Sequence, residues 1–295
     1  MKNTTTRTAS MKRKEHIGNV FTYVFLTILS IVWLAPFVCL LLQSFISNEE
    51  YMTNKATYLI PKTWSLSNYA FLFSENCNFV RWYLNTLLIA TVVAVLQTII
   101  VLCVSYALSR MRFKGRTLLM RFWLILGMFP GFLTMICLYF MLQQVGLTGT
   151  GAIPGLILVN VASSGMGYYV CKGYFDTIPK ALDEAARIDG ASRARVFAII
   201  TAPMSKPIII YTALVAFLAP WCDYVFASYI AWTTKTSYNV AVGLADWVYN
   251  QDFQTKGYIT YFYAGGILVA IPVTILFMWL QKYYVEGVTG GAVKG

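Results

Sequence analysis

Residues 82–109 read WYLNTLLIATVVAVLQTIIVLCVSYALS and include no charged side chain. A helix needs about 20 consecutive apolar residues to cross the hydrocarbon core of a bilayer. This uninterrupted run is long enough for one crossing. It therefore predicts a membrane-spanning helix over about residues 84–106.

Four further stretches have the same character. Residues 17–48, 122–171 and 257–281 carry no charge, and residues 207–234 carry one, on Asp223. The polar sequence QQVGLTGTG, at residues 143–151, divides the second stretch into two spans. We therefore predict an all-α integral membrane protein with six transmembrane helices. They lie at about residues 20–42, 84–106, 122–142, 152–171, 207–230 and 260–281.

The composition agrees with this class of protein. Only 12% of the residues are charged and 58% are hydrophobic, and the mean hydropathy is +0.61. In a soluble domain, about a quarter of the residues are charged. The first span follows a basic segment, as a cleaved signal peptide would, but it is far longer than a signal core of about 7–15 residues. We therefore expect the first span to remain in the protein as a membrane anchor and not to be cleaved.

The basic residues predict how these spans are oriented. Of the 23 Lys and Arg residues, 18 lie in the two tails and in the second–third and fourth–fifth loops, and 5 lie in the other loops. Loops rich in Lys and Arg remain cytoplasmic, so both termini are expected in the cytoplasm. The net charge of +11 then reflects contact with anionic membrane lipid at the helix ends and not a nucleic-acid partner.

No motif in the chain indicates a cofactor, a metal or a catalytic group. His16 is the only histidine, and the six cysteines show no metal-ligand spacing. No Gly-Lys dipeptide occurs, which excludes a phosphate-binding loop of the Gly-x4-Gly-Lys-Ser/Thr type. We therefore expect that this chain is not an enzyme and does not hydrolyse ATP alone.

The predicted spans divide the chain into five parts. A basic cytoplasmic tail covers residues 1–19, and the first transmembrane helix is followed by an extracytoplasmic loop at residues 43–81. A five-helix core covers residues 82–281, with a cytoplasmic loop at residues 172–206 and an extracytoplasmic loop at residues 231–259. Residues 282–295 form a cytoplasmic tail.

The cytoplasmic loop carries the clearest local signals. Residues 177–192 read TIPKALDEAARIDGAS, which predicts a short helix with a sharp end. Pro179 suits the first helical position, and Gly190 suits a left-handed cap after the last turn. Ser192 can cap a second helix at residues 193–200. One face of the first helix combines Leu182, Ala185, Ala186 and Asp189.

That face predicts a helix that docks in a groove of another protein, because small side chains allow a partner backbone to approach closely. An ordinary amphipathic cytoplasmic helix has a similar composition, and the motif spacing distinguishes the two. Glu184-Ala185-Ala186, then Gly190, Ile200 and Pro203 resemble the signature loop of binding-protein-dependent ABC importer permeases. Ala202 stands where that motif usually has leucine.

Two longer strings resemble the carbohydrate branch of this family. One is DEAARIDGA, at residues 183–191, and the other is the tail GVTGGAVKG, at residues 287–295, which is similar to the end of maltose-type permeases. WCDY, at residues 221–224, resembles a sugar-permease motif, with Cys222 in place of asparagine.

The resemblance implies the type I importer fold and a coupling helix that docks on a separate ATPase subunit, which holds ATP and Mg. The ATPase-coupling residues it implies are Leu182, Asp183, Glu184, Ala185, Ala186, Asp189, Gly190, Ile200 and Pro203. It also implies a second ATPase contact through Gly290, Gly291 and Lys294.

The partners implied are a second permease subunit in a heterodimer, two cytoplasmic ATPase subunits and an extracytoplasmic sugar-binding protein. The location implied is a bacterial-type inner membrane. The chain would be the permease subunit of an ATP-driven importer of an oligosaccharide or maltodextrin-like sugar. Trp247 and Tyr249 are candidate contacts for the binding protein, although both could also fold back on their own loop.

Asp223 is the only acid in a predicted span, and such residues are candidates for function. With Trp221 and Tyr224 it could line a sugar path, or it could form an interhelical hydrogen bond. An ion-coupled secondary carrier that uses Asp223 is the alternative function. A membrane-embedded enzyme is a weaker alternative, because the spans contain no pair of carboxylates or histidines.

Overall fold

The computed structural model describes residues 3–54, 59–249 and 257–292, and within these ranges every regular element is a helix. Side-chain surroundings are described for residues 18–53, 59–249 and 257–281. The longer helices are α1 (Asn3–Ser44), α4 (Phe79–Arg110), α5 (Arg116–Gly127), α6 (Gly131–Gln144), α7 (Ala152–Ala162), α8 (Gly165–Thr177), α12 (Lys206–Cys222) and α16 (Tyr258–Ala292). The shorter ones are α2 (Asn48–Asn54), α3 (Ser67–Leu72), α9 (Lys180–Ile188), α10 (Arg193–Val196), α11 (Ala202–Met204), α13 (Val225–Ala231) and α14 (Val240–Tyr249).

The described helices account for the predicted spans. Four segments are long and apolar enough to cross a membrane, and two bent helix pairs bring the number to six if each pair is one span. The four are Gly18–Ser44, Phe79–Arg110, Gly149–Thr177 and Tyr258–Gln281. The bent pairs are α5 with α6, at 100°, and Arg193–Met204 with α12, at 85°.

Three predicted spans are interrupted. The fourth has a short break between α7 and α8, within the apolar segment Gly149–Thr177. The third bends between α5 and α6, where Pro130 precedes the first residue of α6 and cannot donate a backbone N–H. The prediction of one helix over residues 207–230 was wrong, because α12 ends at Cys222 and α13 starts at Val225. Asp223 accepts hydrogen bonds through Oδ1 from the N–H groups of Phe226, at 3.2 Å, and Ala227, at 3.4 Å. A carboxylate that caps a new helix in this way favours a break over a continuous helix.

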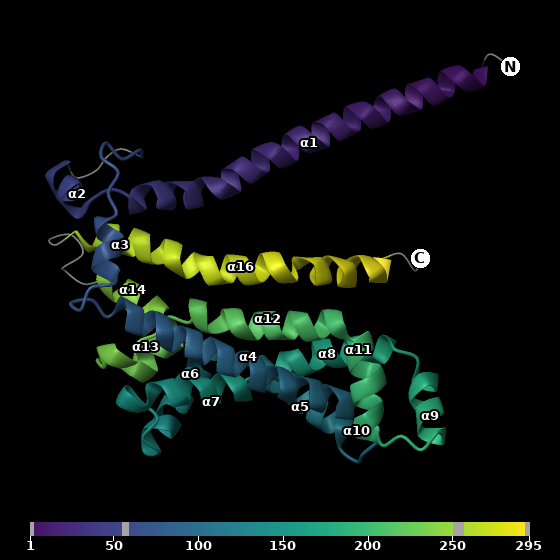
Figure 1. The fold of residues 1–295 in the computed structure, drawn as a ribbon. Coiled ribbons are helices and arrows are strands. Elements are labelled where there is room, and N and C mark those ends of the chain that lie inside the picture. The colour runs from purple at the N-terminus through teal and green to yellow at the C-terminus, as the bar shows by residue number, and fades with distance from the viewer. Residues whose placement is uncertain (1–2, 55–58, 250–256, 293–295) are drawn as a thin grey trace.

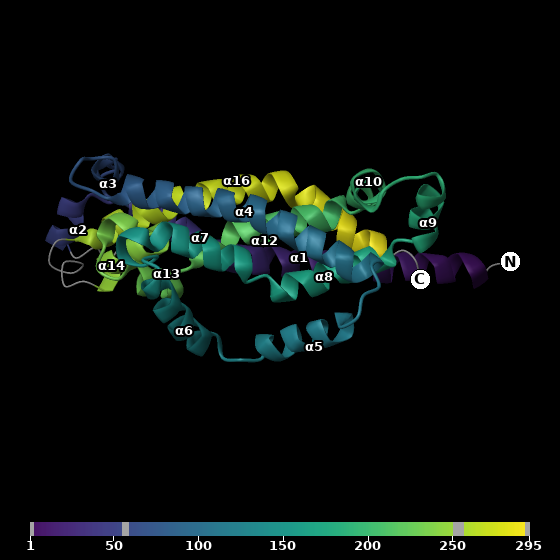
Figure 2. The same ribbon diagram turned by 90° about the horizontal axis from the view of Figure 1, so that it is seen from below.

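The molecule is elongated, and its two ends differ in structure (Figures 1 and 2). The N-terminus of α1, the C-terminal end of α16, α9 and α10 lie toward one end, and α2, α3 and α14 lie at the other. Helix α1 diverges from the bundle, and its apolar side chains from Val20 to Val38 are exposed. A helix that is apolar on all sides needs lipid or another membrane protein around it.

Helix α4 organises the core, with α7, α8, α12 and α14 packed around it. Three polar side chains near its start hold the segment that leads into α14. Trp82 donates its indole N–H to the carbonyl of Lys235, at 2.7 Å, and Asn85 donates to the carbonyl of Tyr238, at 2.9 Å. Thr86 accepts the N–H of Val240 at 2.8 Å. The bonds from Asn85 and to Thr86 pair backbone groups of two buried residues, Tyr238 and Val240.

Gly243 is expected to tolerate no larger residue, because a Cβ built on it lies 2.0 Å from the buried ring of Trp82. Gly243→Ala must displace that ring and lose its bond to Lys235, so we expect destabilisation by about 1–3 kcal/mol or more. Thermal unfolding of the purified protein in detergent measures this. Gly165→Ala is the matched control, since a Cβ there meets no atom within 4 Å, and equal melting temperatures for the two variants would contradict the packing described.

Candidate functional site: the α9 loop

Helix α9 starts and ends through local sequence. Pro179 lies just before the helix, at the N-cap with φ −58° and ψ 125°, and not at the first helical position as predicted. Its ring still constrains the entry of the chain into the helix, because it restricts φ to values near −65°. Asp183 lies in the first turn, where the helix dipole favours negative charge.

The end of α9 is a Schellman turn built on Gly190. This residue has a φ of +85°, the Ala191 N–H bonds to the carbonyl of Ala186 at 3.0 Å, and the Gly190 N–H bonds to that of Arg187 at 3.1 Å. Only glycine adopts this left-handed conformation without strain. The predicted glycine cap is therefore confirmed.

The second helix of the loop also begins as predicted. Ser192 Oγ accepts the backbone N–H of Arg195 at 3.3 Å, so it caps α10. The chain continues through a π-helical turn, Phe197–Thr201, into α11. Ile200 is half-buried and Pro203 is exposed, and the bend into α12 comes after Met204.

Most of α9 faces solvent. Leu182 is 40% exposed and Ile188 is 86% exposed, and Glu184, Ala185 and Asp189 are also exposed. Ala186 is half-buried. Three of the four residues of the predicted docking face are thus accessible, and exposed apolar side chains on a protruding helix indicate a surface that a partner covers.

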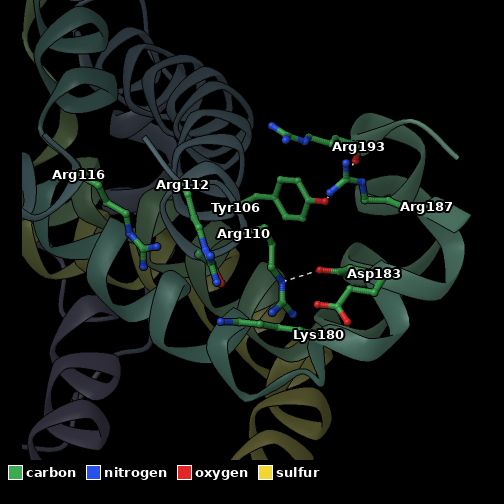
Figure 3. Close-up of a pocket in the computed structure, with 10 residues that line it drawn as sticks. Tyr106, Arg110, Arg112, Arg116, Lys180, Asp183, Arg187 and Arg193 are labelled. Atoms are coloured by element: carbon green, nitrogen blue, oxygen red, sulfur yellow. Dashed lines mark hydrogen bonds and ion pairs between the residues drawn. The ribbon is translucent and has the colours of Figure 1, made fainter. Parts of the chain in front are cut away.

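Asp183 faces the rest of the chain (Figure 3). Its Oδ2 lies 2.8 Å from Nε of Arg110, the last residue of α4, and the two side chains are only 12% and 6% exposed. Arg110 also donates from Nη2 to the carbonyl of Ile178, at 2.9 Å. This pair joins a membrane-spanning helix to α9, so Asp183 holds the helix and leaves its outer face free.

Sequence reasoning assigned Arg110 to the basic loops that set orientation and missed this role. The only signal was its position at the end of a charge-free run, which places an obligatory cation beside the cytoplasmic loop. Which acid it would meet depends on how α4 and α9 pack, and spacing along the chain does not determine that.

The predicted sugar-path residues lie in different surroundings. Trp221 is buried against the rings of Tyr83 and Phe217, with centroids 5.3 Å and 6.0 Å away. Asp223 caps α13, as described above. Tyr224 is exposed, and its ring lies 6.0 Å from that of Tyr249. The structure therefore brings Tyr224 and Tyr249 together and places Trp221 in the core.

The two predicted binding-protein contacts also separate. Trp247 is 8% exposed and packs 5.3 Å from the ring of Trp82, so its assignment as an exposed anchor was wrong. It is a core residue because α14 packs against α4. Tyr249 is 76% exposed. Gly290 and Gly291 lie in the last part of α16, where side-chain surroundings are not described, and Lys294 lies outside the described residues.

Within the described residues, no cluster of His, Cys, Asp or Glu could hold a metal ion. The loop offers a surface and an anchor instead. Residues 99–290, which include α9 and its flanking helices, match the family described as the inner membrane component of binding-protein-dependent transport systems.

The chain belongs to this permease family.

Two relatives from Bacillus subtilis match this permease over nearly their whole length. It is 37% identical to the maltodextrin transport system permease protein MdxG of Bacillus subtilis over 95% of this chain and 97% of that protein. It is 36% identical to the galactooligosaccharides transport system permease protein GanQ of the same organism, over 97% of this chain and 99% of that protein. A bacterial ABC transporter of known structure, involved in import of the polysaccharide alginate, has a chain with the same fold, with a TM-score of 0.76 at 22% identity over 92% of this chain and 98% of that one.

These matches establish a multi-pass inner-membrane transport subunit with the type I importer fold. They give no support to the ion-coupled carrier, and the capping role of Asp223 gives that residue a structural explanation.

Asp223→Asn is expected to retain uptake, because asparagine caps a helix about as well as aspartate. Asp223→Ala removes the cap and should lower stability by about 0.5–2 kcal/mol. Uptake at saturating ATP, together with thermal unfolding, separates these effects. If Asp223→Asn alone stopped uptake in a stable protein, a titrating carboxyl would be required and the structural role would be insufficient.

Proposed function

We propose that the chain is one permease subunit of an ATP-driven, binding-protein-dependent importer of oligosaccharides, with maltodextrin-like cargo. The names of its relatives support this cargo class, since maltodextrin and galactooligosaccharide permeases match it at 37% and 36% identity. The aromatic pair Tyr224 and Tyr249 offers a surface suited to a sugar or to a protein that carries one.

Helix α9 is the coupling element in this proposal. The observation that carries it is the buried Arg110–Asp183 pair, which fixes α9 to the end of α4 while Leu182, Glu184 and Ile188 remain exposed. A docked ATPase that moves α9 would thereby move α4, which is the centre of the helix bundle. The exposed residues would contact the ATPase, and Gly190 would set the turn that presents them.

The end of the molecule that carries α9 and both termini (Figure 1) is assigned to the cytoplasm. Two ATPase subunits that bind ATP and Mg would dock there, and a second, non-identical permease would cover the exposed face of α1. The extracytoplasmic sugar-binding protein would dock at the opposite end, near Tyr249. The basic residues that concentrate in the tails and the loop around α9 support this orientation.

Transport by purified transporter in sealed proteoliposomes tests the proposal. With binding protein and maltodextrin outside and ATP inside, we expect uptake that continues after an ionophore removes the proton gradient. Uptake that stops with the gradient while ATP remains high would contradict the proposal and favour a carrier.

Tyr249→Ala is expected to weaken the affinity of the transporter for the binding protein, because an exposed aromatic residue at the centre of an interface contributes about 2 kcal/mol or more. Its melting temperature should not change. Trp247→Ala provides the comparison, since it empties a core position and should cost about 3–5 kcal/mol of stability. If Tyr249→Ala left the binding-protein affinity unchanged, the docking site would lie elsewhere.

A further inference from the structure

A basic cavity of about 420 Å³ lies beside the contact between α9 and the end of α4 (Figure 3). It is bounded by the last turn of α4, the loop into α5, α9 and the start of α10. Six cationic side chains and two carboxylates line it, namely Arg110, Arg112, Arg116, Lys180, Arg187, Arg193, Asp183 and Glu184.

The positive charge of this cavity exceeds what its own acids neutralise. Within the described residues, Arg110–Asp183 is the one ion pair among its lining side chains. Like charges held close together repel one another, most strongly where protein excludes water. An anion in the cavity would relieve this repulsion.

The buried pair provides an independent indication of a ligand. Arg110 has a side chain that is 6% exposed, and neither Nη1 nor Nε makes a hydrogen bond, although Nε lies 2.8 Å from Oδ2 of Asp183. Oδ1 of Asp183 also lacks a partner. A buried polar group without a hydrogen bond is costly, and this pair has two such donor nitrogens, on Arg110, and one such acceptor oxygen, on Asp183. A ligand with both a phosphate oxygen and a hydroxyl group would offer an acceptor to Arg110 and a donor to Asp183.

The surroundings of the cavity favour a lipid as the source of this phosphate. Arg112 and Arg116 flank Phe113, which is exposed, and α5 continues from there with Leu118 72% exposed. Acyl chains could lie along this apolar face while the headgroup enters the cavity. Basic pockets beside membrane-spanning helices on the cytoplasmic side suit anionic headgroups.

We propose that this cavity binds the headgroup of an anionic phospholipid with a polyol headgroup, such as phosphatidylglycerol. The proposal rests on the orientation given above, which places α9 at the cytoplasmic surface. The bound headgroup bridges the α4–α5 loop and α9, so it adds a second connection to the one made by Arg110 and Asp183. Anionic lipid content then controls how firmly α9 is held.

Lipid selectivity of the purified transporter tests this site. Spin-labelled phosphatidylglycerol and phosphatidylcholine are compared in nanodiscs for wild type, the cavity variant Arg112→Gln/Arg116→Gln and the control variant Arg121→Gln/Arg195→Gln. The control removes the same charge from exposed arginines that do not line the cavity. We expect the preference for phosphatidylglycerol to fall by about fivefold for each cavity arginine removed and to be unchanged in the control.

Equal preferences in the cavity variant and wild type, or an equal loss in the control, would overturn the proposal. Displacement of the labelled lipid by millimolar inorganic phosphate would also overturn it, by indicating a site for soluble phosphate. Lipid binding is measured without ATP, so its failure leaves the proposed transport function intact. Failure of ATP-driven uptake would leave a measured lipid site standing.

Discussion

Arg110→Met should abolish ATP-driven uptake. The substitution leaves the Asp183 carboxylate buried without its cation and removes the bond from Arg110 to the Ile178 carbonyl. Loss of one partner of a buried ion pair costs about 3–5 kcal/mol. Helix α9 then separates from α4, so we expect uptake and binding-protein-stimulated ATP hydrolysis to fall by more than about tenfold.

The double variant Arg110→Met/Asp183→Leu distinguishes an anchor from a general fold defect. Two apolar residues of similar size often replace a buried ion pair with little loss, so the double variant should transport better than either single variant. Lys235→Met is the control, because its partner Asp246 forms an exposed pair at 3.0 Å that is worth about 0–1 kcal/mol. If Arg110→Met transported sugar as well as wild type, the Arg110–Asp183 pair would not be the mechanical connection between α4 and α9.

Gly190→Val should uncouple ATP hydrolysis from transport. Valine at φ +85° is strained by about 1–2 kcal/mol or more, since its branched side chain disfavours the left-handed region. A Cβ at this position meets no atom within 4 Å, so the effect comes from the backbone and not from a clash. We expect the Schellman turn to open and the orientation of α9 relative to the helix bundle to change, while the six-span bundle stays folded.

Gly190→Asn is the matched variant, because asparagine tolerates the left-handed region and meets the same open space. It should retain most transport activity. Gly173→Ala, at another position where a Cβ meets no atom, should behave as wild type. If valine and asparagine at position 190 had the same effect on binding-protein-stimulated hydrolysis, the turn conformation would not matter for coupling.

The sequence predicts the spans and the local geometry of α9 well, because both depend on nearby residues. A charge-free run such as residues 82–109 requires a membrane wherever it packs. The caps made by Gly190 and Ser192 involve partners within five residues, so the amino-acid sequence alone indicates them.

Features that depend on packing are less accessible to sequence analysis. Arg110 and Asp183 are far apart in sequence, and no periodicity connects them. Trp247 lies in a polar loop but is buried, because α14 returns to pack on α4. At the end of α12, the carboxylate of Asp223 caps α13 and its carbonyl accepts from the distant Asn239. The apolar sequence on both sides of Asp223 gives no sign of that break.

Co-purification of an ATPase subunit tests the central claim most directly. Tagged wild type and the exposed-face variant Glu184→Lys are isolated in mild detergent and analysed for associated ATPase, with Arg195→Gln as a surface control outside α9. We predict that wild type and the control retain the ATPase and that Glu184→Lys loses it while remaining folded. Absence of ATPase from wild type, or full retention by Glu184→Lys together with normal uptake, would contradict the assignment of α9 as the coupling helix.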